Sequence, residues 1–306
     1  MPKIKYKKIN LNTHSRYLLD KCQDIIINYQ SKGFTLTLRQ LYYQLVSKNL
    51  ILNEVKAYKA LVVLISKARL GGFIDWNAIE DRTRFIRTLP HWHSPLEIIT
   101  ATAGQYRRDK WEWQKYRPEI WIEKDALIGV IEPICNKYDV PYFSCRGYSS
   151  LSEMWRAGLR SLDAMANTSY PKYPIIIHLG DHDPSGLDMT RDIQNRMNLF
   201  TGRKVKVVRI ALNMNQIRKA KPLIPPNPTK ITDSRAPEYI KKFSNDSWEL
   251  DALPPDTLMA LVETEVKKYQ DMDNWRSTER KERKERALLA NIVDKWDRVK
   301  KAVQPK

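Results

Sequence analysis

The strongest chemical signal in the sequence is a pair of carboxylates at the end of a buried strand. Residues 175–186 read Ile-Ile-Ile-His-Leu-Gly-Asp-His-Asp-Pro-Ser-Gly, and the apolar run predicts a strand covered on both faces. Residues two apart in an extended segment point the same way, so Asp181 and Asp183 can face one point. Carboxylates at a strand's carboxyl end suit Mg²⁺. The alternative is a turn in which Ser185 caps the next helix and Asp188 is its N3 acid.

A third acid, Glu123, ends an earlier predicted strand in the segment Trp-Ile-Glu-Lys-Asp. The carboxyl ends of parallel strands share one edge, so Glu123 would meet Asp181 and Asp183 if their strands are neighbours. Three carboxylates holding Mg²⁺, or Mn²⁺ in its place, could stabilise the charge on a phosphodiester undergoing displacement. The alternative is that Glu123 forms a structural ion pair with Lys124 or Arg146. Both cations are also candidates for binding DNA phosphate.

Strand and helix patterns alternate from residue 119 onward, which argues for a mostly parallel, Rossmann-like sheet. The elements expected, in chain order, are 119–123, 126–137, 141–145, 150–165, 173–179, 187–200 and 205–212. A proline-rich excursion covers 222–235, and its role stays open between a loop near DNA and a surface loop. His182 alternates with the two aspartates and is expected to face away from them.

The first part of the chain carries three helix patterns, expected at 13–32, 37–48 and 54–70. Thr37 and Gln40 form a capping-box pattern, and Asn53 is the expected cap of the third helix. With 73–76 as a strand or wing, the pattern is typical of a winged helix-turn-helix, whose third helix enters the DNA groove. The cations on that helix are Lys56, Lys59, Lys67 and Arg69.

The fold class expected is therefore α/β, with an α-rich winged helix-turn-helix before the sheet domain. The expected divisions are 1–93 for the DNA-binding domain, 94–118 for a connector helix, 119–270 for the sheet domain and 271–306 for a charged C-terminal helix. Ser94, Pro95 and Glu97 predict the connector's start. The C-terminal helix has an apolar stripe for docking one face, at Leu288, Ile292, Trp296 and Val299.

The charge balance points to a polyanionic partner. Lys and Arg number 53 against 35 Asp and Glu, which gives a net charge of +18 and an isoelectric point near 9.7. Double-stranded DNA is the simplest partner, because neutralising phosphates releases counterions. No apolar stretch is long enough for a membrane span, and no signal peptide is evident. Three scattered cysteines indicate a reducing setting, so we expect a cytoplasmic, nucleoid-associated protein.

These acids resemble the metal-binding motif of Toprim domains, in which Glu ends a first strand and Asp-x-Asp-Pro-x-Gly follows a later one. The segment Leu-Arg-Gln-Leu-Tyr-Tyr at 38–43, upstream of such a domain, resembles the A subunit of topoisomerase VI, a type IIB topoisomerase. Stand-alone bacterial, plasmid and phage versions called mini-A are the most similar. The segments 79–84 and 248–253 fit the same family, and the resemblance covers about residues 15–270.

Helix geometry distinguishes the two neighbouring tyrosines. Tyr42 lies on the apolar stripe of its helix, whereas Tyr43 is turned about 100° away and shares a face with Arg39. We therefore expect an exposed Tyr43 phenol beside a guanidinium that could stabilise a phenolate or a phosphate. The alternative is that Tyr43 only packs against another domain or stacks on DNA. In the family resembled, the second of two aromatics is the nucleophile, which implies Tyr43.

The resemblance implies a homodimer that cuts both DNA strands and becomes linked to their 5′ ends. Mg²⁺ held by one subunit would serve the other subunit's tyrosine. The short segment before the first helix and the absence of a Walker A motif imply that ATP-driven strand passage needs a separate B-type ATPase subunit. We expect the isolated chain to bind and cut DNA without relaxing it. A hydrolytic Toprim nuclease and a non-catalytic DNA-binding protein are the alternatives.

Overall fold

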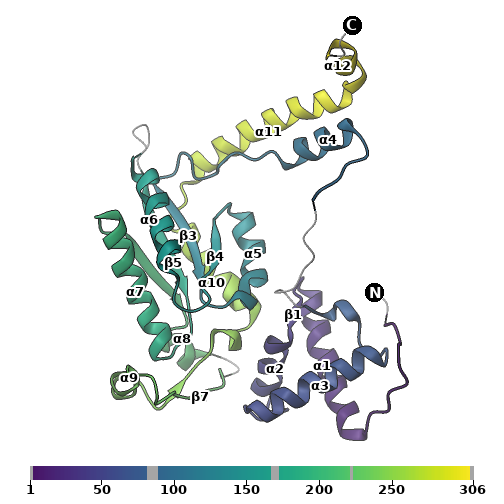
Figure 1. Ribbon diagram of the computed structural model, residues 1–306, viewed down its shortest axis with the longest axis vertical. Helices are drawn as coiled ribbons and strands as arrows, with labels where there is room; N and C mark the ends of the chain where they lie inside the picture. The colour runs from purple at the N-terminus through teal and green to yellow at the C-terminus, as the bar shows by residue number, and fades with distance from the viewer. Residues whose placement is uncertain (1–2, 81–88, 167–171, 221–222, 304–306) are drawn as a thin grey trace.

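Four parallel strands form the sheet on which the candidate site is built. The computed structural model describes residues 3–80, 89–166, 172–220 and 223–303 as a mixed α/β protein (Figure 1). The strand order is β4-β3-β5-β6. The bounds are Tyr116–Ile122 for β3, Tyr142–Ser144 for β4, Tyr173–Leu179 for β5 and Lys206–Ala211 for β6. The predicted parallel sheet is confirmed.

Helices cover both faces of this sheet because successive strand residues point to opposite sides. Ile120 and Ile177 join the larger core with α5 (Ile128–Lys137) and α10 (Pro255–Lys267). Trp121 and Ile176 belong to a separate buried cluster on the other side, together with residues of two further helices. Those helices are α6 (Leu151–Ala166) and α7 (Pro184–Thr201). The central strands β3 and β5 are therefore enclosed, as their apolar runs predict.

The N-terminal unit contains the three predicted helices, α1 (Thr13–Ser31), α2 (Leu38–Ser47) and α3 (Val55–Leu70). Its only strands in the described ranges are β1 (Leu36–Thr37) and β2 (Ile79–Glu80), which pair in parallel. The predicted strand at 73–76 is wrong. After Gly72, whose φ is +73°, the chain turns into a short 3₁₀ segment, η1 (Trp76–Ala78). Residues 81–84 of the 79–84 segment lie outside the described ranges.

Local capping decides where two of these helices begin. The Thr37 side chain accepts from the backbone N–H of Gln40, and the Gln40 side chain accepts from that of Thr37, so the predicted capping box is confirmed. Asn53 does not cap α3, because Glu54 occupies the N-cap position without a side-chain bond. The side-chain oxygen of Asn53 instead accepts a hydrogen bond from the Tyr42 hydroxyl, and its side-chain NH₂ group donates one to the carbonyl of Pro226.

The connector and the C-terminal helix pack together as a helical arm, α4 (Pro95–Gln105), α11 (Met272–Asp294) and α12 (Trp296–Val303). Ser94 caps α4 as predicted. The prediction that this helix runs to about residue 116 is wrong. Trp111 is fully buried, donates to the Tyr138 carbonyl and packs edge-on against Trp275. Because that anchor draws the chain into the core, the helix ends at Gln105.

The expected apolar stripe of the C-terminal segment is only partly covered. Leu288 is 64% exposed, whereas Ile292, Trp296 and Val299 are half-buried. The segment divides into α11 and α12 at Lys295. Figure 1 shows the arm extending from the sheet unit at the end away from β7.

Short elements complete the edge of the sheet where the acids lie. They are η2 (Asp125–Leu127), α8 (Met214–Lys219), β7 (Asn227–Pro228), α9 (Ala236–Lys242), β8 (Asp246–Ser247) and η3 (Leu250–Ala252). The strands β7 and β8 pair antiparallel. Across the described parts of the chain, no helix combines the length and the apolar character needed to cross a lipid bilayer.

Replacing Thr37 tests the capping box. Thr37→Ala should lower the free energy of unfolding by about 1 kcal/mol, because the first turn of α2 loses a side-chain acceptor. Thr37→Ser keeps a hydroxyl at the cap and should retain most of the stability. Urea unfolding followed by circular dichroism measures both changes. Equal midpoints for Thr37→Ala and the unmodified protein would show that the cap contributes nothing.

Candidate functional site at the carboxyl edge of the sheet

Glu123 and Asp181 meet at the carboxyl edge because their strands, β3 and β5, are neighbours in register. The Glu123 carboxylate accepts from the backbone N–H of Asp181 at 2.8 Å. Gly180 permits this approach, since a Cβ at that position would lie 2.9 Å from Glu123 Oε2. The adjacency that the sequence predicts for these two acids is therefore present, and it depends on a glycine just before Asp181.

Asp183 has a structural role that the sequence analysis assigns to other residues. Its Oδ1 accepts from the backbone N–H of Gly186 at 2.6 Å, which makes Asp183 the N-cap of α7. Ser185 lies inside the helix and donates to the same oxygen at 3.1 Å. Asp188 is paired with Arg191 and Arg235 and does not cap. The predicted cap at Ser185 is wrong, because Asp183 occupies the N-cap position and accepts the backbone N–H of Gly186 in the first turn of α7.

Asp181 turns toward a lysine from the neighbouring strand end. Its Oδ1 lies 3.1 Å from the Lys124 ammonium and accepts from the backbone N–H of Leu250 at 2.7 Å. Lys124 also donates to Glu249 at 2.8 Å. The ammonium is mostly buried, with 20% of the side chain exposed, so these pairs are largely removed from solvent. Lys124 is therefore held among carboxylates in this conformation.

Two acids that the sequence analysis does not select, Glu249 and Asp251, complete this cluster. They are positioned by a backbone bridge between His182 and Trp248, with N–O distances of 2.8 and 2.9 Å. Asp251 is 2% exposed, and the cationic groups of Arg39 and Lys124 lie 2.9 and 3.6 Å from its carboxylate. Acids at i and i+2 in the segment 248–253 are the one sequence signal that could have indicated this pair.

His182 lies on the opposite side of the strand end, as predicted. Its Nδ1 is 2.8 Å from the Tyr239 hydroxyl, and its ring packs edge-on against Phe243 and Trp248. The side chain is 1% exposed. The histidine therefore holds the segment around β8 against the sheet edge, and among the described residues its ring forms no hydrogen bond with Asp181 or Asp183.

Arg209 is a second residue that sequence reasoning misses, because it comes from the interior of β6. Its guanidinium donates to the carbonyls of Gly180 at 2.8 Å and Gly186 at 2.9 Å. Burial lowers the pKa of Arg209 to about 10, since the charged form loses hydration. The arginine holds the backbone that carries Asp181 and Asp183 in a compact turn.

Tyr43 is buried, so the expectation of an exposed phenol is wrong. Only 3% of the residue is exposed, because α2 packs against η3 of the sheet unit. The predicted partnership with Arg39 is present, with 3.4 Å between Nη2 and the hydroxyl and 5.6 Å between Cζ and the ring centroid. The Asn227 side chain also faces the phenol. Tyr42 is 5% exposed, as its place on the apolar stripe predicts.

Arg39 connects Tyr43 to the acids of the sheet edge. Its Nε lies 2.9 Å from Asp251, and its Nη2 contacts Glu249. Lys124 is paired with the same two carboxylates. Arg39 and Lys124 therefore share two acids, and a continuous chain of charged contacts runs from the Tyr43 hydroxyl to Asp181.

Charge and burial shift the acidity of three of these groups in different directions. Burial and the nearby Glu249 carboxylate raise the pKa of Tyr43 to about 12, although Arg39 opposes the shift. Burial and the charge of Asp181 raise the pKa of Glu123 to about 7. Burial alone would raise the pKa of Glu249, but Lys124 and Arg39 outweigh it and lower the value to about 2. Glu123 is therefore an acid whose ionised form lacks adequate compensation.

The edge offers oxygen ligands without forming a closed cage. Among the described residues, no three His, Cys, Asp or Glu side chains are grouped closely enough to hold a metal ion. Glu123 and Asp183 each use one carboxylate oxygen in a backbone hydrogen bond. Magnesium commonly takes one or two protein carboxylates and keeps several waters. The donor chemistry and the uncompensated charge of Glu123 thus fit a partly hydrated divalent cation.

The predicted DNA-binding cations fall into two groups. Lys56, Lys59 and Lys67 are exposed on α3. Arg69 donates to the Trp76 carbonyl at 2.9 Å and to the Ile79 carbonyl, and its guanidinium lies over the Trp76 ring. Arg69 therefore stabilises the turn between α3 and β2. The sequence does not indicate this role, because it depends on hydrogen bonds to backbone carbonyls that only the folded turn brings close.

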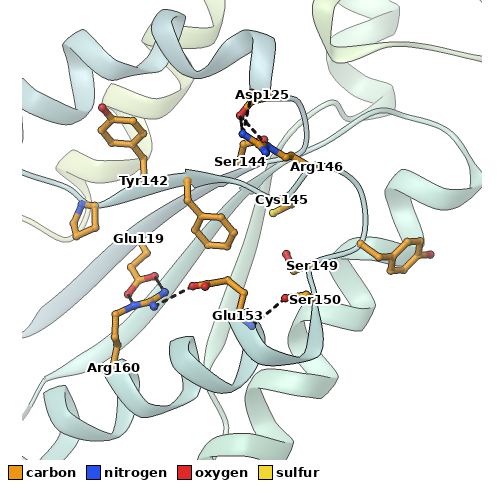
Figure 2. Close-up of a pocket in the computed structure, with 13 residues that line it drawn as sticks. Glu119, Asp125, Tyr142, Ser144, Cys145, Arg146, Ser149, Ser150, Glu153 and Arg160 are labelled. Carbon is orange, nitrogen blue, oxygen red and sulfur yellow. Dashed lines mark hydrogen bonds and ion pairs between the residues drawn. The ribbon is translucent and has the colours of Figure 1, made fainter. Parts of the chain in front are cut away.

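Arg146 lies at the rim of an open cleft beside β4, of about 720 Å³. It is paired with Asp125 at 3.2 Å, and its side chain is 74% exposed. Figure 2 shows this pair at one end of the cleft and Arg160 between Glu119 and Glu153 at the other. Glu123, Asp181 and Asp183 do not line this cleft. The cleft is therefore separate from the edge of the sheet where those acids lie.

No protein-family model matches the chain, and no curated protein is similar enough in sequence to count as a relative.

The raised pKa of Glu123 predicts a pH-dependent stability difference. Between about pH 4.5 and 7 the folded protein keeps a proton on Glu123 that the unfolded chain releases, so this group's effect on stability becomes unfavourable as the pH rises. Glu123→Gln should thus be more stable than the unmodified protein at pH 8, by about 1 to 3 kcal/mol, and nearly equal at pH 4.5. Urea unfolding across this pH range measures the difference.

The control for this experiment is Glu238→Gln, which removes an exposed carboxylate on α9. It should show no gain that grows with pH. A Glu123→Gln difference that stays constant from pH 4.5 to 8 would mean that the carboxyl does not titrate between those values.

Proposed function

We propose that the protein is a DNA-cleaving enzyme that acts by tyrosyl transfer, built like the A subunit of type IIB topoisomerases. In this proposal the N-terminal unit serves as a winged-helix domain and the sheet unit as a Toprim domain. The observation that carries it is the position of Arg39, which contacts both the Tyr43 hydroxyl and the carboxylates of Glu249 and Asp251. The contacts of Arg39 thus join Tyr43 to the acids of the sheet edge in this conformation, which supports a shared role for these residues.

Each residue has a stated role in the proposed reaction. The Tyr43 oxygen loses its proton and forms a bond to phosphorus, while the bond to the 3′ oxygen breaks and that oxygen gains a proton. Arg39 stabilises the phenolate or the phosphate by charge. Glu123, Asp181 and Asp183 would hold Mg²⁺, or Mn²⁺ in its place. The bound ion would stabilise negative charge on the phosphate.

The buried phenol indicates that this conformation is not the one that attacks DNA. A side chain 3% exposed cannot reach a phosphodiester, and a pKa near 12 leaves it protonated at neutral pH. Cleavage in this proposal therefore requires the N-terminal unit to separate from the sheet edge and the ion pairs of Arg39 to break. In a homodimer, each released tyrosine would meet the acids of the partner subunit.

The same burial favours a second candidate, a hydrolytic Toprim nuclease. If water attacks the phosphodiester at the acid edge, Tyr43 can stay packed against η3 and serve only structure. Either activity acts on double-stranded DNA, which suits the basic composition. Strand passage driven by ATP would require a separate B-type ATPase subunit in the topoisomerase-like case.

Covalent capture distinguishes the two reactions. The protein is incubated with linear duplex DNA and Mn²⁺ and denatured, and protein linked to DNA is measured on a gel. Tyr43→Phe should abolish the adduct and the cutting, and Asp181→Asn should reduce both at least about 100-fold. Tyr42→Phe is the matched control and should retain adduct formation, because Tyr42 bonds to Asn53 and to the backbone near α3.

Cutting that survives Tyr43→Phe without an adduct would replace tyrosyl transfer with hydrolysis. Binding without cutting by the unmodified protein, in both Mg²⁺ and Mn²⁺, would contradict the enzymatic proposal.

Mixing two inactive variants tests whether the site is shared between subunits. Tyr43→Phe and Asp181→Asn are denatured together and refolded, so that mixed dimers form. One intact composite site should then appear in each mixed dimer, and supercoiled plasmid should be nicked on one strand. Each variant refolded alone is the control and should leave the plasmid intact. If the mixture is as inactive as each variant alone, the site is not shared between subunits, and the tyrosine must act with the acids of its own chain.

A further inference from the structure

The helical arm separates its charges between two faces. On α11, the side chains of Arg276, Arg280, Arg283 and Lys284 are all exposed. These four residues fall within about 100° of one another around a helix with 3.6 residues per turn. We call them the outer face of the arm. Within the described residues, none of these four cations forms an ion pair, and all four side chains are open to solvent.

Two acids in the middle of α11, Glu282 and Glu285, point the other way, into the contact with the segment after α4. The exposed Asp273 and Asp294 lie near the two ends of the helix. Glu282 pairs with Lys110 at 2.7 Å, and Glu285 pairs with Arg108 at the same distance. Glu282 also accepts from the backbone N–H of Arg108 at 2.9 Å, and Glu285 accepts from the Tyr106 hydroxyl. The charges in the middle of α11 are therefore divided between two sides, because Glu282 and Glu285 are paired inside the arm.

The length of α11 matches a regular polyanion. Its 23 residues span about 35 Å, close to one turn of B-form DNA. The large apolar side chains exposed on this helix are Met272 and Leu288, which lie one turn before Arg276 and one turn after Lys284 and form no continuous apolar face. A membrane-surface helix would instead combine its cations with a free apolar face, but here Trp275 is buried on the side toward Trp111.

We propose that the outer face of the arm binds the phosphate backbone of double-stranded DNA, as a second contact separate from the acid edge. The binding is independent of sequence, since long cations reaching phosphates carry no base information. It goes beyond the cleavage proposal, because a folded arm can hold DNA whether or not Tyr43 attacks it. With the exposed lysines of α3, it would let one chain contact the duplex at two distant places.

The test is a charge-removal variant in which Arg276, Arg280, Arg283 and Lys284 are all replaced by Gln. Binding to a fluorescent duplex of about 30 base pairs is measured by anisotropy in EDTA, which prevents metal-dependent cutting. The variant should bind about 10- to 100-fold more weakly at about 0.1 M salt, and the slope of log affinity against log salt should fall by about 2 to 4.

The matched control removes the same number of positive charges from the sheet unit, by replacing Lys137, Arg203, Lys204 and Lys267 with Gln. Its affinity and salt slope should change much less than those of the arm variant. Thermal unfolding of both variants shows whether either has lost structure. A folded arm variant whose affinity and slope equal those of the control overturns the proposal.

A third measurement separates DNA from an anionic surface of another kind. Flotation with phosphatidylserine vesicles should give the same small binding for the unmodified protein and the arm variant. Vesicle binding that the arm variant alone loses, with DNA binding unchanged, would assign the outer face to a membrane and overturn the proposal. Loss of DNA binding by the arm variant in a protein that forms no covalent adduct would leave this inference standing and remove only the cleavage proposal.

Discussion

A shared cluster of opposite charges joins the two halves of this molecule. Arg39 comes from the N-terminal unit, Lys124 comes from the sheet edge, and both are paired with Glu249 and Asp251. Breaking a largely buried pair by removing one partner is costly, because the remaining charge has lost its hydration and its partner. The position of α2, the burial of Tyr43 and the orientation of Asp181 all follow from this one cluster.

The same edge combines compensated and uncompensated carboxylates. Glu249 has two cations beside it and ionises easily, whereas Glu123 is pressed against Asp181 and resists ionisation. Perturbed acids of this kind gather at functional sites, but structural ion-pair networks perturb them as well. In this protein the pairing with Lys124 and Arg39 accounts for the lowered pKa of Glu249, whereas burial beside Asp181 accounts for the raised pKa of Glu123.

The regular features of the fold could be predicted from the sequence, because short-range rules decide them. The apolar run before Asp181 specifies β5 to the residue, and the pattern at Thr37 and Gln40 marks the start of α2. That Glu123 meets Asp181 could be predicted only on the condition that β3 and β5 are neighbours, and the strand order meets this condition. These predictions need only strand periodicity, helix capping and the shared edge of parallel strands.

The remaining features depend on contacts between distant segments, which local patterns do not contain. Whether Tyr43 is exposed depends on what packs against α2, and η3 lies more than 200 residues later in the chain. From the sequence, Asp183 could cap the next helix or face the same point as Asp181. In the fold it caps α7, because the backbone N–H of Gly186 donates to its carboxylate. The early end of α4 follows from the burial of Trp111 beside Trp275. Each case needs a partner that only the folded chain supplies.

The side chain of Gln114 forms two hydrogen bonds with the backbone of Asp271, at 2.7 and 3.0 Å. The chain therefore enters the sheet unit and leaves it at nearly the same place. A domain whose two ends lie side by side suits insertion into another protein and circular permutation, because neither change requires its backbone to stretch.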